Sequence, residues 1–185
     1  TEQTVFVIIG VPERSVTTQQ TARAVLASGG TVIVLDGVST YANRFLDSIG
    51  ADARVGDRPL RDLESYYRSP SLPIINSKNI TLQNRSIDEF TLNHAASIKR
   101  NSATVIATSS NISYVDQNRN DQVDENESIE SQVVMTREPV ANGSVVLLSD
   151  ASVLTNAMLD EEGNQKLARV LLDSYNQVII GGYNK

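Results

Sequence analysis

The sequence predicts a three-layer α/β domain in which a mostly parallel, flavodoxin-like sheet carries helices on both faces. Three observations predict this fold class. The strand candidates are short, continuous apolar runs, amphipathic segments of helical length alternate with them, and the connections are short. Continuous apolar strands are typical of parallel sheets that are buried on both faces. With 185 residues, the chain fits one domain, which we expect to span residues 1–185.

The N-terminal third is expected to form a βαβ unit with a right-handed crossover. Thr17 and Gln20 have capping-box spacing at the start of the first helix, and Gly29-Gly30 supplies its stop. The predicted order is a strand at 4–10, a helix at 17–28, a strand at 31–35, and a helix with apolar positions Tyr41, Phe45 and Ile49 that ends at Gly50.

The pattern weakens over residues 51–93, where Pro70 and Pro73 interrupt regular structure. Asn142-Gly143 is a strong hairpin signal ahead of the last third of the sheet. The further elements are expected as an edge strand at 72–75, strands at 104–108, 131–136 and 144–148, a helix at 164–175 and a final strand at 178–180.

Composition excludes several classes of function. The chain has no cysteine, so thiolate catalysis, disulfides and thiolate metal sites are excluded, and any imidazole chemistry depends on the single histidine, His94. The net charge of -6 argues against a nucleic-acid partner. No apolar run has membrane-spanning length, and the chain opens on Thr1 without a signal peptide. We therefore expect an excised piece of a longer protein, with any membrane anchor outside it.

One segment carries a motif with a chemical mechanism. Residues 116–127 match the twelve-residue calcium loop, whose alternate residues direct oxygen ligands at one centre. Gln122 stands where only the backbone carbonyl is used, and Val123 stands where such loops carry an apolar residue that packs inward. The predicted ligands of a structural calcium ion are Asp116, Asn118, Asn120, Gln122, Asp124 and Glu127.

Two features of this loop depart from the EF-hand. Asp121 stands at position 6, where the pattern has a glycine with a positive φ. The flanking segments do not show the pattern of the two helices of an EF-hand. We therefore expect a calcium-loop insertion at about 112–130 within the α/β domain. The loop carries five acids and one base, a charge of -4, so most of the net charge of the chain lies there. A solvated acidic surface loop is the alternative interpretation.

A second candidate site is the crevice at the carboxyl ends of the parallel strands, where open α/β sheets bind ligands. The polar residues expected there are Asp36, Ser39, Ser149, Asp150 and those of 109–111. A Ser–His–Asp hydrolase built from them with His94 has little support, because no Gly-x-Ser-x-Gly elbow is present. No phosphate-binding glycine loop is present either.

Residues 7–12, 27–34 and 143–152, together with Asn156, resemble an uncharacterised family of archaeal and bacterial domains of unknown function. That family is similar to class I glutamine-amidotransferase-like domains and to the auxiliary domain of gliding-motility-type ABC transporters. The resemblance implies a flavodoxin-like sheet and an extracytoplasmic part of a membrane-anchored protein. It implies no catalytic residue, because glutaminases of this fold use a Cys–His pair and this chain has no cysteine.

These observations favour a non-catalytic, extracytoplasmic binding or interaction domain with a structural calcium ion and a protein or glycan partner. Five Asn-x-Ser/Thr sequons fit an extracellular surface: Asn79, Asn84, Asn111, Asn126 and Asn142. Two alternatives stay open. One is a hydrolase or transferase that uses the crevice residues Asp36, Ser109 and Asp150, and the other is a sensor in which calcium controls partner binding.

Overall fold

The computed structural model describes residues 4–13, 15–38, 41–82, 85–161 and 163–182, with the course of the backbone alone over 77–82. Ser39, expected at the crevice, and the sequon residue Asn84 lie outside the described residues. No helix in the described ranges combines the length and the apolar character needed to cross a bilayer.

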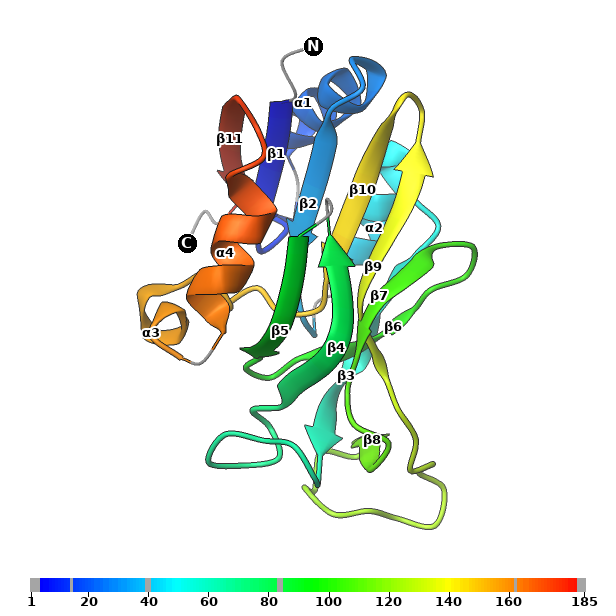
Figure 1. Cartoon of the computed structure of the whole chain (residues 1–185). Coiled ribbons are helices and arrows are strands. Elements are labelled where there is room, and N and C mark those ends of the chain that lie inside the picture. The colour runs from blue at the N-terminus through cyan, green and yellow to red at the C-terminus, as the bar shows by residue number, and fades with distance from the viewer. Residues whose placement is uncertain (1–3, 14, 39–40, 83–84, 162, 183–185) are drawn as a thin grey trace.

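A six-stranded sheet forms the centre of the molecule (Figure 1). Its strands, in spatial order, are β11 (Gln177–Gly182), β1 (Thr4–Ile9), β2 (Thr31–Leu35), β10 (Gly143–Leu148), β9 (Val133–Val140) and β7 (Thr104–Thr108). The first four strands are parallel to one another, whereas β9 is antiparallel to β10 and β7 is antiparallel to β9.

The two faces of this sheet are covered differently. Helices α1 (Val16–Ala27) and α2 (Tyr41–Ile49) pack on the face that carries Phe6 and Ile8. Helix α4 (Asn164–Leu172) shares the opposite face with a hairpin made of β4 (Ile74–Leu82) and β5 (Arg85–Thr91). Because side chains alternate along a strand, the same strands supply both buried clusters. A short helix, α3 (Asn156–Leu159), precedes α4.

A second, smaller sheet continues away from the central one. Its middle strand is β3 (Arg54–Asp62), which pairs antiparallel with β6 (Ala96–Lys99) near one end and with β8 (Ser113–Val115) near the other. In Figure 1, β8 and the loop that follows it lie at the end of the molecule farthest from the N-terminus. The predicted calcium loop therefore lies beside the small sheet.

The prediction of a three-layer flavodoxin-like fold with a mostly parallel sheet and helices on both faces is wrong. Helices make up only about 20% of the chain, the sheets are mixed, and a β-hairpin occupies much of one face where helices were expected. The cause lies in the segment of weak pattern, which folds into β3, β4, β5 and β6. Bulges interrupt the alternation in β3 and β4, so that period-2 patterning is lost there.

Most individual elements outside that segment form close to their predicted positions, but their ends differ. Helix α1 begins after Ser15, whose side chain accepts a hydrogen bond from the Thr18 N–H, so the cap is not at Thr17 as predicted. The hairpin signal is confirmed, since β9 and β10 are joined through Ala141 and Asn142. A Cβ on Gly143 would lie 2.2 Å from the Gly30 carbonyl oxygen, so this position requires glycine.

Candidate functional site

The start of the acidic loop is positioned by the pairing of β3 with β8. Arg61 lies opposite Tyr114 and Asp62 opposite Ser113 in this antiparallel ladder. The backbone N–H of Asp116 donates to the Pro59 carbonyl, so the first predicted ligand is held against the small sheet. Asp116 is fully buried there. Burial, and next the Asp116 carboxylate, raise the pKa of the neighbouring Tyr114.

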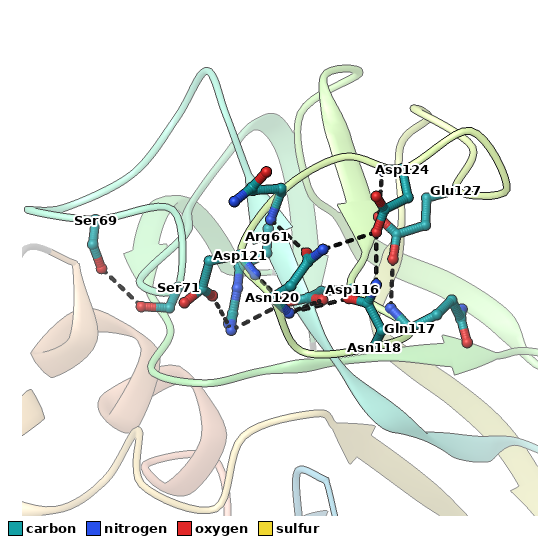
Figure 2. A network of polar contacts seen from close by, with 11 residues as sticks. Arg61, Ser69, Ser71, Asp116, Gln117, Asn118, Asn120, Asp121, Asp124 and Glu127 are labelled. Atoms are coloured by element: carbon teal, nitrogen blue, oxygen red, sulfur yellow. Dashed lines mark hydrogen bonds and ion pairs between the residues drawn. The ribbon is translucent and has the colours of Figure 1, made fainter.

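The first half of the loop is curled around the side-chain oxygens of its alternate residues (Figure 2). Asp116 accepts hydrogen bonds from the backbone N–H groups of Asn120, at 3.1 Å, and Asp121, at 3.2 Å. Asn118 Oδ1 also accepts from the Asn120 N–H, and Asn120 Oδ1 accepts from the Gln122 N–H. Asp121 has a φ of 61°, the left-handed conformation that position 6 of a calcium loop requires.

The second half closes onto the first through two carboxylates. Asp124 Oδ2 accepts from the side-chain amides of Asn118 and Asn120, at 2.7 and 3.0 Å. Glu127 accepts from the backbone N–H of Gln117 at 2.7 Å and of Asp124 at 3.1 Å, so the last predicted ligand lies over the beginning of the loop. The structure thus brings the predicted ligands into one closed loop, with Asp116 and Glu127 buried.

Two features of the loop differ from the calcium-loop pattern. Val123 is 40% exposed and therefore does not pack inward as predicted. Among the described residues, no group of three or more His, Cys, Asp or Glu side chains is placed to hold a metal ion. The oxygens that the loop presents also include those of Asn118 and Asn120.

Arg61 is a residue of this site that the sequence pattern did not reveal. Its Nη2 forms an ion pair with Asp121 and lies 3.3 Å from Asp116 Oδ2, as Figure 2 shows. The side chain is only 9% exposed. Arg61 lies far from the loop in sequence, and only the pairing of β3 with β8 brings the two together, so no local signal marks it.

In the second candidate site, the crevice at the strand ends, most of the predicted residues lie in two separate cavities. Asp36 and Asp150 line one cavity of about 310 Å³ together with His94. Ser109 lines a different cavity of about 530 Å³, which His94 does not line. Ser149 is fully buried, and its hydroxyl has no hydrogen-bond partner in the described part of the chain. Neither serine is therefore placed as an exposed nucleophile beside His94.

The two crevice carboxylates have structural hydrogen bonds. Asp36 Oδ2 accepts from the Val11 N–H at 2.7 Å. Asp150 accepts from the Asn93 N–H and from both the N–H and the hydroxyl of Ser152. Burial raises the pKa of Asp150, and these hydrogen bonds and His94 oppose that shift. Both carboxylates thus join loops at the strand ends to the sheet.

The fold has counterparts among solved structures. A β-galactosidase from Rahnella sp. R3 superimposes with a TM-score of 0.52 at 8% identity, over 93% of this chain and 22% of that chain. The exo-β-1,4-mannosidase Op5Man5 from Opitutaceae bacterium strain TAV5 superimposes with a TM-score of 0.50 at 11% identity, over 95% of this chain and 25% of that one. The chain thus spans about a quarter of the length of these enzymes, and at such identities the likeness concerns the fold alone.

Among curated proteins, none matches this sequence. A family model does match, over residues 1–172, and it describes a domain of unknown function, DUF4350. The match covers nearly all of the chain, including the strands of the central sheet up to β10 and the acidic loop. An uncharacterised family was expected from the sequence, and this much of the expected resemblance is confirmed. The chain belongs to the DUF4350 family.

Proposed function

We propose that residues 116–127 bind a calcium ion that orders the end of the domain formed by β3 and β8, in a non-catalytic binding or interaction domain. The observation that carries the proposal is Glu127, which is only 8% exposed and accepts two backbone hydrogen bonds. Among the described residues, no basic side chain forms an ion pair with Glu127. A buried carboxylate without a counter-charge is costly, and a cation in the loop would supply one.

The hydrogen bonds in the loop leave some lone pairs of its side-chain oxygens unused. A carboxylate or amide oxygen has two lone pairs, so an oxygen that accepts one backbone N–H can still bind a metal. Calcium takes six to eight oxygens, which the loop can supply without any nitrogen or sulfur ligand. The proposed ligands are Asp116, Asn118, Asn120, Asp124, Glu127 and the backbone carbonyl of Gln122.

A loop closed without metal is the competing interpretation, and Arg61 is the observation in its favour. The guanidinium neutralises part of the charge of Asp116 and Asp121. It contacts Asp116 through Oδ2, whereas Oδ1 faces the Asn120 N–H. Arg61 thus contacts one oxygen of this carboxylate, and the other oxygen, Oδ1, keeps a lone pair beside its bond to the Asn120 N–H.

Calcium binding is tested by calorimetric titration and thermal melting of the intact chain. At 10 mM calcium and a Kd of about 10⁻³ to 10⁻⁴ M, binding should stabilise the fold by about 1.4 to 2.7 kcal/mol. The melting temperature should then rise by about 5 °C. Asp124→Ala should abolish the shift, because it removes a proposed ligand.

Glu125→Ala is the matched control for that substitution. Glu125 is an exposed neighbour in the same loop, so this variant loses the same charge without losing a proposed ligand. It should retain the thermal shift, and magnesium should produce a smaller one. If calcium shifts the melting temperature of both variants equally, or if the calorimetric titration of the parent chain shows no heat up to 10 mM calcium, the metal-free loop would be favoured.

The non-catalytic part of the proposal rests on the crevice, where Asp36 and Asp150 are engaged by backbone N–H groups and Ser149 is buried. We further propose an extracytoplasmic location, because a loop of this affinity is filled at the millimolar calcium found outside cells. Membership of a membrane-anchored, transport-associated system rests on the resemblance of residues 7–12, 27–34 and 143–152 described above. The alternative is a hydrolase or transferase at the cavity shared by Asp36, His94 and Asp150.

A further inference from the structure

We propose that Arg61, His94 and Arg119 form a binding site for the carboxylate, sulfate or phosphate group of a small anionic ligand. They line a cavity of about 460 Å³ whose remaining wall is Val38 and Pro59. Val38 and His94 also line the cavity that contains Asp36 and Asp150, so the two hollows adjoin. The three basic residues come from β3, from the segment between β5 and β6, and from the acidic loop.

Arg61 has two nitrogen donors that find no acceptor among the residues that the structure describes. Only Nη2 contacts Asp116 and Asp121. Nε and Nη1 are buried, and neither has a hydrogen-bond partner among the described residues. Buried donors without acceptors are uncommon in folded proteins and call for an explanation. A ligand oxyanion in the adjoining cavity supplies the missing acceptor once the guanidinium turns one of these nitrogens toward it.

Arg119 and His94 are the other basic residues that line the cavity. Within the described ranges, the guanidinium of Arg119 makes only a long hydrogen bond, 3.4 Å from Nη2 to the Asp57 carbonyl oxygen. His94 is exposed and has a φ of 54°. Its backbone N–H donates to the Ser71 carbonyl. A positive φ is uncommon at a residue other than glycine, although histidine adopts it more readily than most residues do. Here it accompanies an imidazole that lines both hollows.

The carboxylates nearby are engaged and do not exclude an anion. Asp116 and Asp121 contact a single nitrogen of Arg61, and Asp36 and Asp150 accept hydrogen bonds from the backbone. Guanidinium groups match carboxylate, sulfate and phosphate oxygens through paired N–H donors. The apolar wall of Val38 and Pro59 suits a ligand that carries this group on a short carbon framework. The site is thus built for an organic anion, and its residues are in place without calcium in the loop.

The site is tested by NMR chemical-shift titration of the intact chain with sulfate, acetate and methyl phosphate at low ionic strength. Titrations are run in EDTA and again with calcium, so that failure of the calcium proposal does not decide this one. At least one of the three probes should bind with a millimolar Kd and shift the signals of His94 and Arg119. The preferred probe identifies the headgroup.

Arg119→Gln and His94→Gln should each weaken binding of that probe at least fivefold. Arg85→Gln is the matched control, because Arg85 is also an exposed arginine but pairs with Asp173, 3.8 Å away, and does not line this cavity. It should bind as the parent chain does. Absence of binding by all three probes at 50 mM, or an equal loss in Arg85→Gln, would overturn the proposal.

Discussion

Asp150 illustrates what burial does to a single residue of this protein. It is 1% exposed and is held by donors from Asn93 and Ser152, yet burial dominates and raises its pKa. Because the folded pKa lies above the unfolded one, the folded state binds the proton more tightly. The stability that this residue contributes is therefore fully present below the unfolded pKa and is lost as pH rises through the folded pKa.

We predict that Asp150→Asn removes this pH dependence. The free energy of unfolding of the parent chain, minus that of the variant, should decrease as pH rises above the ordinary aspartate pKa of about 4. Urea denaturation between pH 3.5 and 7 measures it. Since other carboxylates titrate identically in both chains, the difference isolates Asp150. A difference that is constant with pH, or that increases, would contradict the prediction.

At the same scale, the sequence pattern identified some residues of the candidate site and missed others. The twelve-residue pattern identified the residues that close the loop, because their spacing is local and most of their oxygens accept from an N–H nearby in the chain. It did not identify Arg61, which reaches Asp116 through strand pairing. It also placed Val123 inward, whereas 40% of this residue is exposed.

At the scale of elements, Asn164 links a helix to a hairpin. It is fully buried at the start of α4, accepts from the Thr91 N–H at 2.8 Å and donates to the Thr91 carbonyl at 2.9 Å. It also donates to the Met158 carbonyl at 2.8 Å. The docking of α4 beside β5 thus rests on one amide side chain as well as on apolar contacts.

We predict that Asn164→Ala destabilises the chain by about 3 kcal/mol, because it removes the hydrogen bonds of the buried amide to the Thr91 backbone and to the Met158 carbonyl. Chemical denaturation measures the loss. Gln165→Ala, at the exposed neighbouring position, should change stability by less than about 0.5 kcal/mol. A loss below 1 kcal/mol for Asn164→Ala would show that apolar packing alone docks α4.

The prediction of helices and strands was most accurate where the apolar pattern of a segment was uninterrupted along its length. The buried strands β1, β2 and β10 and the helix α2 were recognised from their own residues. The segment from β3 to β6 was not, because bulges and Pro59 break the alternation of β3, and bulges also break that of β4. Helices were therefore assigned to a sheet face that the β4–β5 hairpin and α4 share.

At the scale of the whole molecule, the acidic loop and the basic cavity are adjacent, since Arg119 belongs to the first and lines the second. The loop carries a charge of -4 without metal. One bound calcium ion would reduce that charge to about -2 and lower the repulsion of an anion in the cavity. The two proposed sites should therefore be coupled.

We predict that calcium raises the affinity for the preferred anion about fivefold, and that the anion raises calcium affinity by the same factor, as linkage requires. Calorimetric titration of each ligand at fixed concentrations of the other measures both factors. Asp124→Ala should abolish the coupling but retain anion binding in EDTA. Anion affinity that is independent of calcium would show that the two sites act separately.

By itself, the sequence determined the buried parallel strands, the helices beside them and the closed acidic loop, because each depends on a periodicity or spacing within a few residues. Only the tertiary structure decided the antiparallel pairing of β7 with β9, the hairpin on one face, the meeting of Arg61 with Asp116 and the basic cavity at His94. These features depend on pairing between distant segments. Such pairing is governed by register and burial in the assembled chain, and no local pattern encodes it.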